Sequence, residues 1–395
     1  RNKMPISIVT FADLGKKNNL KTIDVLPIIK IFDEKKKLSN IFCRINTGFY
    51  FRNTKGMISF LCHIFLKILE RVSFYVFSAR KIEERLCDSL VSCEKKLNNP
   101  VFFLPEYFFS KSVSSIQKQG LVSVGFATMA HPGFNAFLEE EENLILKIKN
   151  KKNHSIYKSI FNSNKNINEF SYIIAYSDFV KKTYIDFDFP ESRIFVAQND
   201  IDIKRFPLVD KKESGIFKVL YVANTNTLKG LHYLLNAWSF LGLKNAELIL
   251  VGGYSNSIPR DLKSNYKRII KNNSSIKWVN FTSFPEEYYL QANVFVMPSL
   301  TEGNPRVVME AMASGLPVIT TENAVGLVKD KENGYIVPIR NSGALAERIK
   351  FLYDNRKMCL EMGKKSREIM ENKKGFSEEV FKIYQDILKR EDLIS

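Results

Sequence analysis

Residues 294–320 read VFVMPSLTEGNPRVVMEAMASGLPVIT, the pattern of a strand, a loop, a helix and a second strand. Val294–Met297 is a short run of apolar residues, typical of a strand that is buried on both faces of a parallel sheet. Asn304 is a favourable N-cap, Pro305 fits the first position of a helix, and Gly315 is typical of a helix end. The stretch therefore predicts a β-α-β unit and, with it, an α/β fold.

Two glutamates in this unit are candidates for a functional role. Glu310 is the only ionisable residue in the apolar helical run 307–313, and a buried carboxylate is unfavourable unless a partner or a ligand compensates it. A structural glutamate bonded to neighbouring backbone is one alternative. Glu302, in the loop before the helix, favours a functional role, because two carboxylates at the carboxyl end of a parallel strand suit sugar or ribose hydroxyls.

The composition is that of an ordinary soluble globular protein. The chain has 395 residues, 45% of them hydrophobic and 26% charged, which suggests two or three domains. Its five cysteines form no Cys-x-x-Cys pair and its four histidines lack metal-ligand spacing. We therefore expect a reduced, cytoplasmic protein with no zinc site and no signal peptide.

The net charge of +17 is unevenly distributed along the chain. Residues 1–80 contain 15 Lys and Arg against 5 Asp and Glu, a balance of +10, which indicates an anionic partner such as nucleic acid or an anionic membrane surface. Residues 57–77 form a long apolar segment, but the charged residues in its middle make a membrane-spanning helix too costly. We expect an amphipathic helix there, either on a membrane or packed on the protein.

Apolar strands alternate with helical stretches along the chain, which predicts parallel sheets. The predicted strands lie at residues 6–11, 101–104, 122–127, 172–176, 217–222 and 246–251. The polar segment 207–215 separates two such series. We therefore expect an N-terminal α/β domain at 1–207, a second α/β domain at 208–375, and a helix at 376–395. The four glutamates at 139–142 are expected on a solvated helix.

The loop at residues 223–230 joins a predicted strand to a helix N-terminus and carries Lys229. A lysine beside the free N–H groups of a helix N-terminus suits a phosphate, although a surface lysine is the alternative. The spacing of a P-loop and the Gly-x-Gly-x-x-Gly fingerprint are both absent, which argues against a nucleoside triphosphatase and a simple dehydrogenase.

Together these motifs resemble the retaining nucleotide-sugar glycosyltransferases of family 4, the group 1 glycosyltransferases. Glu302 and Glu310 are separated by seven residues, as in that family, and the strings AYSDFVKK at 175–182 and NGYIV at 333–337 also match its motifs. The resemblance covers residues 100–390 well and the first hundred only in outline. It implies an α/β protein of GT-B fold, with two Rossmann-like, doubly wound domains that face each other across a cleft.

The resemblance also implies the roles of the main site residues. In such enzymes the first glutamate contacts the donor sugar and the second contacts the ribose, which gives these roles to Glu302 and Glu310. Lys229 matches the lysine that neutralises the diphosphate leaving group. Backbone N–H groups from Gly303 and Asn304 onward would add to that neutralisation at the helix N-terminus.

Two further residues come from the first domain. His131 follows a predicted strand and resembles the family histidine near the reacting sugar carbon, with a structural histidine as the alternative. Gly15, in the loop after the first predicted strand, is a candidate substrate-binding residue.

The chain departs from the family at one position. The family usually has Gly-Arg-Leu where this chain has Ala223-Asn224-Thr225, so the arginine that joins the lysine on the diphosphate is replaced by Asn224. Arg306 could lie near the helix N-terminus and substitute for it. The string Asp200-Ile201-Asp202 imitates an Asp-x-Asp metal motif, but its setting fits the domain junction. No metal and no cofactor are expected.

The resemblance implies a retaining glycosyltransferase that moves a sugar from a nucleoside-diphosphate sugar to a glycan or lipid-linked glycan acceptor in surface polysaccharide biosynthesis. The expected location is the cytoplasm, with peripheral contact at the inner face of an anionic membrane. One alternative is a GT-B nucleotide-sugar epimerase, which should have more ionisable residues in the cleft. The other is a basic nucleic-acid-binding protein, which explains the charge but not a buried Glu310.

Overall fold

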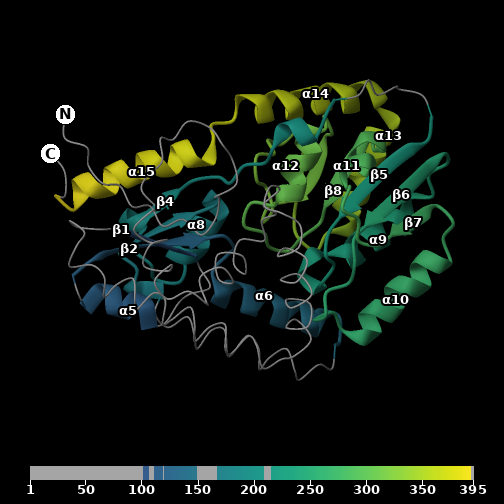
Figure 1. Cartoon of the computed structure of the whole chain (residues 1–395). Coiled ribbons are helices and arrows are strands. Elements are labelled where there is room, and N and C mark those ends of the chain that lie inside the picture. The colour runs from purple at the N-terminus through teal and green to yellow at the C-terminus, as the bar shows by residue number, and fades with distance from the viewer. Residues whose placement is uncertain (1–100, 106–110, 119, 149–166, 209–214, 393–395) are drawn as a thin grey trace, which may run out of the picture. The chain divides into compact units, whose positions relative to one another are not determined.

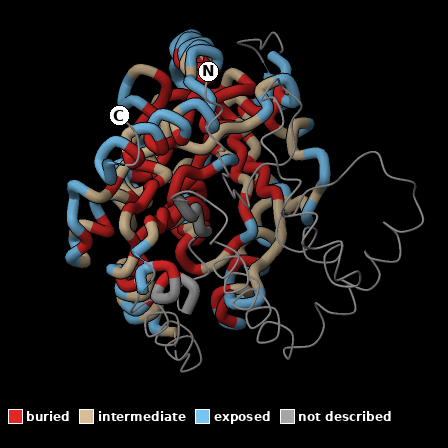
Figure 2. The backbone as a smooth tube through the Cα atoms, turned by 60° about the vertical axis from the view of Figure 1, so that its left-hand side comes forward, coloured by how far each residue is buried: buried red, intermediate tan, exposed pale blue. Residues whose placement is uncertain are grey.

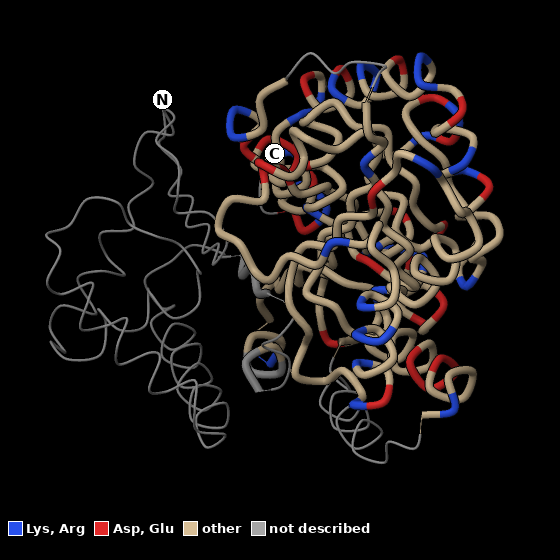
Figure 3. The backbone as a smooth tube through the Cα atoms, turned by 90° about the vertical axis from the view of Figure 1, so that its right-hand side faces the viewer, with Lys and Arg blue, Asp and Glu red and all other residues tan. Residues whose placement is uncertain are grey.

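The computed structural model describes residues 101–105, 111–118, 120–148, 167–208 and 215–392. The strand expected at residues 6–11, Gly15 and the amphipathic helix expected at 57–77 lie outside this part of the chain. The basic excess counted over residues 1–80 also lies outside it, whereas Figure 3 shows basic and acidic residues interspersed along the described helices and loops.

Contacts divide the chain into two compact units. The first contains Arg1–Phe126 and Ser163–Ile174, and the second contains Ala127–Asn162 and Ala175–Ser395. The domain limits expected at residues 207 and 375 stay a prediction.

The smaller sheet has four strands in the order β1-β2-β3-β4. Strands β1 and β2 are parallel, with Val101 opposite Val122. The elements of this region are β1 (Val101–Pro105), α5 (Lys111–Lys118), β2 (Val122–Ala127), α6 (Pro132–Ile145), β3 (Tyr172–Ala175), α8 (Asp178–Ile185) and β4 (Ile194–Val196). The strands expected at 101–104, 122–127 and 172–176 are thus confirmed.

The larger sheet has six parallel strands in the order β10-β9-β8-β5-β6-β7 (Figure 1). They are β5 (Phe217–Val222), β6 (Ala246–Val251), β7 (Ile276–Val279), β8 (Val294–Met297), β9 (Val318–Thr321) and β10 (Gly334–Val337). The chain builds outward from β5 to β7 and then from β8 to β10 on the other side, as in a Rossmann fold. The strand order therefore reverses between β5 and β8, where ligands of such sheets bind.

Helices cover both faces of the larger sheet, so its strands are buried (Figure 2). Val294 and Val296 of β8 join a core cluster with α9 (Leu231–Leu241) and α13 (Ser342–Asp354). Phe295 and Met297 join the cluster on the other face, with α11 (Glu286–Gln291) and α12 (Arg306–Ala313). Burial on both faces is why β8 is continuously apolar rather than alternating.

Helix α12 confirms the helix expected in residues 294–320, with one correction at its start. Pro305, with an extended ψ of 117°, holds the N-cap position, and no side chain caps the helix. The expectation that Asn304 is the N-cap is therefore wrong, because the extended Pro305 moves the start of the helix one residue further along. Gly315 has a φ of 69° just beyond the helix, as its position predicted.

The remaining helices are α10 (Arg260–Lys271), α14 (Arg356–Asn372) and α15 (Phe376–Arg390). The last of them confirms the expected C-terminal helix. Its first backbone N–H donates to the Asp200 carboxylate at 3.1 Å, and Arg390 near its end donates to the carbonyl of Ser192 at 2.8 Å. Among the described residues, no helix is both long and apolar enough to span a membrane.

Candidate active site

Lys229 lies just beyond the carboxyl end of β5, in the loop predicted to bind phosphate. The loop forms a short 3₁₀ helix, η5 (Thr227–Lys229), in which the Asn226 side chain accepts the Lys229 N–H at 3.1 Å. Gly230 follows with a φ of 64°, and a Cβ there would lie 2.0 Å from the carbonyl oxygen of Pro298. Only glycine fits such a position, so the loop after β5 packs directly on the loop after β8.

Glu302, in the loop after β8, forms an ion pair with Lys229. The Lys229 Nζ lies 2.5 Å from Oε1 of Glu302, and the Ser299 hydroxyl donates to the same oxygen at 2.9 Å. The Glu302 side chain is 6% exposed and that of Lys229 is 22% exposed. Because β5 and β8 flank the reversal of strand order, the two charges meet where ligands of this fold bind.

Backbone hydrogen bonds hold the Glu302 loop in place. The Leu300 N–H donates to the carbonyl of Leu228 at 2.8 Å, and the Glu302 N–H donates to the carbonyl of Asn323 at 3.0 Å. The Asn323 side chain donates in turn to the carbonyl of Leu300 at 2.9 Å. Ser299 and Asn323 could not be predicted from the sequence, because single hydroxyl and amide side chains in loops follow no pattern.

Gly303 is fixed by close packing against the chain that follows β2. A Cβ on Gly303 would lie 1.8 Å from the carbonyl oxygen of Thr128, so no larger residue fits. The Ser177 hydroxyl, which caps α8, also donates to the carbonyl of Gly303 at 2.5 Å. The residue after Glu302 is thus held by segments that follow both β2 and β3.

The side-chain amide of Asn304 is buried without hydrogen bonds to described residues. Asn304 is 5% exposed, and neither Oδ1 nor Nδ2 of its side chain has a partner among the described residues. Unpaired buried amides are rare and unfavourable, because their bonds to water are lost and not replaced. A polar ligand with a donor and an acceptor would satisfy this group.

Glu310 is half-buried on α12 and accepts a hydrogen bond from the Tyr289 hydroxyl at 2.9 Å. Burial raises the pKa of the Glu310 carboxyl, and the Tyr289 hydrogen bond and the positive charge of Arg306 oppose this rise only in part. Its partner is therefore a side chain of α11 rather than neighbouring backbone. Arg306 itself is exposed, as is Asn224 at the end of β5.

His131 forms the N-cap of α6. Its Nδ1 accepts the Gly133 N–H at 3.1 Å, and its ring stacks on Phe187 with centroids 4.2 Å apart. Burial lowers the pKa of His131 to about 4, so the ring is neutral at pH 7. Since Nδ1 accepts, Nε2 carries the proton and can only donate. Capping gives His131 a structural role, whether or not it also contacts a ligand.

Helix α6 also carries a buried ionic cluster that contradicts the sequence-based expectation of a solvated helix. Glu142 is fully buried. Its carboxylate accepts from His232 and Tyr233 at 2.7 Å each and from Arg340 at 2.8 Å. Burial acts to raise the pKa of Glu142, but these hydrogen bonds hold it below its usual value. Four consecutive glutamates indicated a solvated surface. The sequence did not reveal the partners of Glu142, because they lie far away along the chain.

The Asp200 and Asp202 carboxylates both accept hydrogen bonds from backbone N–H groups. Asp200 accepts from the first N–H of α15, and Asp202 accepts from the Lys204 N–H at 3.3 Å. This fits the domain-junction interpretation of the Asp-x-Asp string. Within the described ranges, no group of three or more His, Cys, Asp or Glu side chains could hold a metal ion.

Comparison with known proteins finds similarity to glycosyltransferases. Residues 216–355 match the family model "Glycosyl transferases group 1". The chain is 30% identical over 240 residues to the capsular polysaccharide biosynthesis glycosyltransferase CapM of Staphylococcus aureus, covering 56% of this chain and 63% of CapM. It is 25% identical over 186 residues to the N,N'-diacetylbacillosaminyl-diphospho-undecaprenol alpha-1,3-N-acetylgalactosaminyltransferase of Campylobacter jejuni, covering 46% of each chain.

The matched regions thus span about half to two thirds of these relatives. Among solved structures, the fold is similar to that of Anabaena HepE in complex with UDP. The TM-score is 0.60 and the identity 16%, and the match covers 77% of this chain and 82% of HepE. The expected architecture of Rossmann-like α/β domains is confirmed. Residues 216–355 are thus similar in sequence to the group 1 glycosyltransferases, and the chain has the GT-B fold of its structural neighbours.

Proposed function

We propose that this protein is a retaining glycosyltransferase that moves a sugar from a nucleoside-diphosphate sugar to a glycan or lipid-linked glycan in surface polysaccharide biosynthesis. The observation that carries the proposal is the Lys229–Glu302 ion pair at the reversal of strand order. Glu310 lies on α12, the helix that follows the Glu302 loop. The names of relatives add support, since CapM acts in capsule biosynthesis and the Campylobacter enzyme is named for a diphospho-undecaprenol acceptor.

Lys229 is the group that neutralises the diphosphate. In the structure Lys229 is paired with Glu302, so binding of a diphosphate exchanges one anionic partner for another. The exchange is favourable because a diphosphate carries more charge than a carboxylate. The free N–H groups at the start of α12 add a partial positive charge on the same side. Arg306, the first residue of α12, is the candidate for the absent family arginine.

Glu302 then orients the donor sugar. Its Oε1 already accepts from Ser299, and Oε2 receives no hydrogen bond from any described residue. Once Lys229 has moved to the diphosphate, both oxygens can accept from sugar hydroxyls. Asn304, with its unpaired amide, lies two residues further along the loop and can join the same ligand.

Glu310 is the partner of the ribose. The Tyr289 hydroxyl occupies Oε2, which leaves Oε1 for a ribose hydroxyl. Burial keeps the proton affinity of this carboxyl high, and a hydroxyl donor stabilises its charged form. His131, neutral and protonated on Nε2, donates to an oxygen of the sugar and is not a general base.

The transfer step needs no protein base. The acceptor hydroxyl oxygen forms a bond to the anomeric carbon as the bond from that carbon to the diphosphate oxygen breaks, on the same face of the sugar. The hydroxyl proton passes to the departing phosphate. The electron pair of the broken bond remains on the diphosphate, which Lys229 stabilises, and no metal ion is required.

Nucleotide binding and product stereochemistry test this proposal. We expect one of UDP, GDP, ADP and CMP to raise the melting temperature, in the presence of EDTA as well as without it. With the matching donor sugar, NMR should show a product that keeps the anomeric configuration of the donor. The proposal is refuted if no nucleotide binds, or if the product has the opposite configuration.

A further inference from the structure

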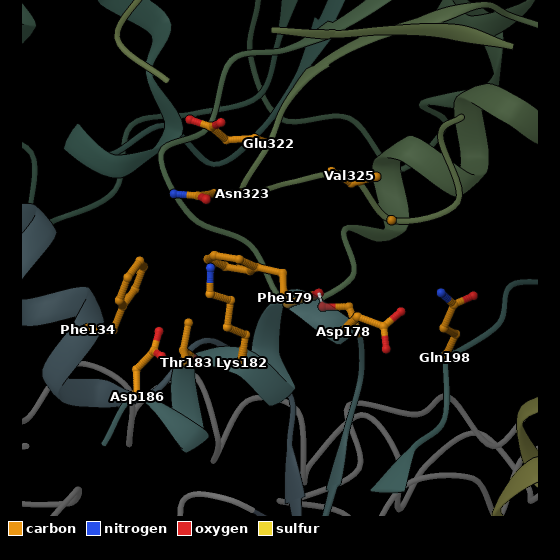
Figure 4. Close-up of a pocket in the computed structure, with 13 residues that line it drawn as sticks. Phe134, Asp178, Phe179, Lys182, Thr183, Asp186, Gln198, Glu322, Asn323 and Val325 are labelled. Atoms are coloured by element: carbon orange, nitrogen blue, oxygen red, sulfur yellow. Dashed lines mark hydrogen bonds between the residues drawn. The ribbon is translucent and has the colours of Figure 1, made fainter. Parts of the chain in front are cut away.

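A cavity of about 580 Å³ opens beside Gly303 and is not used by the donor interactions described above. Helix α8 forms one wall, and the loop after β9, at residues 322–326, forms another (Figure 4). Gly303 lines the cavity and directly follows Glu302 in the chain. Any molecule in this cavity is therefore next to the residue that holds the donor sugar.

The cavity is lined by charged side chains that have no ion-pair partner. Asp178, Lys182 and Asp186 are spaced four residues apart along α8 and its C-terminal cap, and all three line the cavity. None forms an ion pair or a side-chain hydrogen bond with a described residue. Asp178 and Lys182 have the spacing that pairs on a helix surface, yet they remain separate. In Figure 4, Lys182 extends toward the loop that carries Asn323.

Two aromatic rings complete the lining. Phe134 from α6 and Phe179 from α8 meet edge to face, with centroids 5.6 Å apart and planes at 75°. Both side chains are half-buried. Apolar rings beside a few hydrogen-bonding groups are typical of sites for small polar molecules that have one apolar face. A pyranose has such a face, formed by its C–H groups, and hydroxyls around its edge.

The charge of the lining limits which sugar fits. Asp178, Asp186 and Glu322 contribute three negative charges and Lys182 one positive charge, a balance of −2. Carboxylates accept from hydroxyl or ammonium groups and repel phosphate and carboxylate groups. The cavity thus favours a neutral or amino sugar over an anionic one.

We propose that this cavity binds the terminal sugar of the acceptor, and that this sugar is neutral or carries an amino group. The proposal rests on the glycosyltransferase function proposed above and adds the position and chemical class of the acceptor. Phe179 and Phe134 contact the apolar face of the sugar. Asp178, Asp186 and Lys182 bind its hydroxyls, which places the attacking hydroxyl on the side of Gly303.

Direct binding to the full chain in the presence of saturating nucleotide tests the cavity without knowledge of the donor sugar. The probes are p-nitrophenyl β-glucoside, p-nitrophenyl β-glucosaminide and p-nitrophenyl β-glucuronide, followed by saturation-transfer NMR titration. We expect the glucuronide to bind at least about tenfold more weakly than the other two. Phe179→Ala should weaken glucoside binding about five- to tenfold through the lost ring contact. Phe137→Ala, an exposed ring on α6, is the control.

Replacement of two lining carboxylates tests whether their charge excludes anionic sugars. Asp178→Asn with Asp186→Asn should bring glucuronide affinity to within about threefold of glucoside affinity. The matched control is Asp188→Asn, which removes an exposed carboxylate near the end of α8 that does not line the cavity. Nucleotide affinity should be the same in all these variants.

Three results would overturn the proposal: wild-type protein that binds no p-nitrophenyl glycoside, wild-type protein that binds the glucuronide as tightly as the glucoside, and a Phe179→Ala variant with unchanged glucoside affinity. Failure of the glycosyltransferase function would look different. In that case the wild-type protein would bind no nucleotide, whatever the cavity variants did.

Discussion

Replacing Lys229 by Met tests the reasoning about the donor site most directly. The substitution keeps a chain of similar length and removes the charge that pairs with Glu302. It leaves a carboxylate that is 6% exposed with only the Ser299 hydroxyl to compensate it. Two effects should follow, one on the stability of the protein and one on the affinity for the nucleotide.

The stability effect should be moderate. Removal of one partner from a fully buried ion pair costs about 3–5 kcal/mol. Lys229 is 22% exposed and Ser299 still donates to Glu302, so water and the hydroxyl recover part of this loss. We expect the free energy of unfolding to fall by about 2 kcal/mol. A second variant, Glu302→Gln with Lys229→Met, should recover much of it, since no unpaired charge is left.

The affinity effect follows from the lost contact to the diphosphate. A hydrogen bond between charged groups contributes about 1.5–3 kcal/mol. Lys229 must give up Glu302 to make it, so the lower end of that range applies. We expect the nucleoside diphosphate to bind about tenfold more weakly, since about 1.4 kcal/mol corresponds to a factor of ten.

Urea unfolding and calorimetric titration of the nucleotide measure the two effects. Lys277→Met is the matched control, because Lys277 pairs with Glu247 at 2.7 Å on the surface with a side chain that is 57% exposed. That variant should lose less than about 1 kcal/mol of stability and no affinity. The reasoning is refuted if Lys229→Met binds the nucleotide within twofold of the wild-type protein, or if Lys277→Met is destabilised as much.

Three further predictions concern His131, Glu142 and Glu310. The pKa of His131 is about 4 in the folded protein and 6.5 in the unfolded chain, so only the unfolded chain takes up this proton between those values, and stability should fall as the pH drops from 6.5 toward 4. His131→Asn, which can still cap α6, should make urea unfolding less dependent on pH in that window. Glu142→Gln should lower the free energy of unfolding by about 3 kcal/mol, because it removes a fully buried carboxylate that pairs with half-buried Arg340 and buried His232. Glu141→Gln, a 39% exposed partner of Arg340, should change it by less than about 1 kcal/mol. Glu310→Gln should bind ribonucleotide and 2'-deoxyribonucleotide diphosphates with nearly equal affinity in calorimetry, whereas the wild-type protein should prefer the ribonucleotide, and a preference that survives in the variant would contradict the ribose role.

Local patterns in the sequence were enough for β5, β6 and β8 of the larger sheet. The strands expected at 217–222 and 246–251, and the opening strand Val294–Met297, all have the expected bounds. Each is mostly apolar, as is typical of a strand in a parallel sheet whose two faces are covered by helices. The resemblance to the group 1 glycosyltransferases came from the same stretch, in which Glu302 and Glu310 are separated by seven residues, together with the strings at 175–182 and 333–337.

Contacts between distant segments could not be predicted in this way. The interpretation of residues 139–142 as a solvated surface is wrong because the partners of Glu142 lie about 90 and 200 residues further along the chain, at Tyr233 and Arg340. Asn304 is a favourable cap residue by type, but Pro305 takes the N-cap position, and the Asn304 amide has no partner among the described residues.

Sequence alone singled out the candidate site residues, namely Lys229 and the glutamates at 302 and 310, because residue type and spacing along the chain are local properties. Only the tertiary structure decided which of these residues meet. Lys229 and Glu302 meet because β5 and β8 are adjacent at the reversal of strand order. The cavity beside Gly303 likewise exists because α8 and the loop after β9, which are distant in the sequence, line it from two sides.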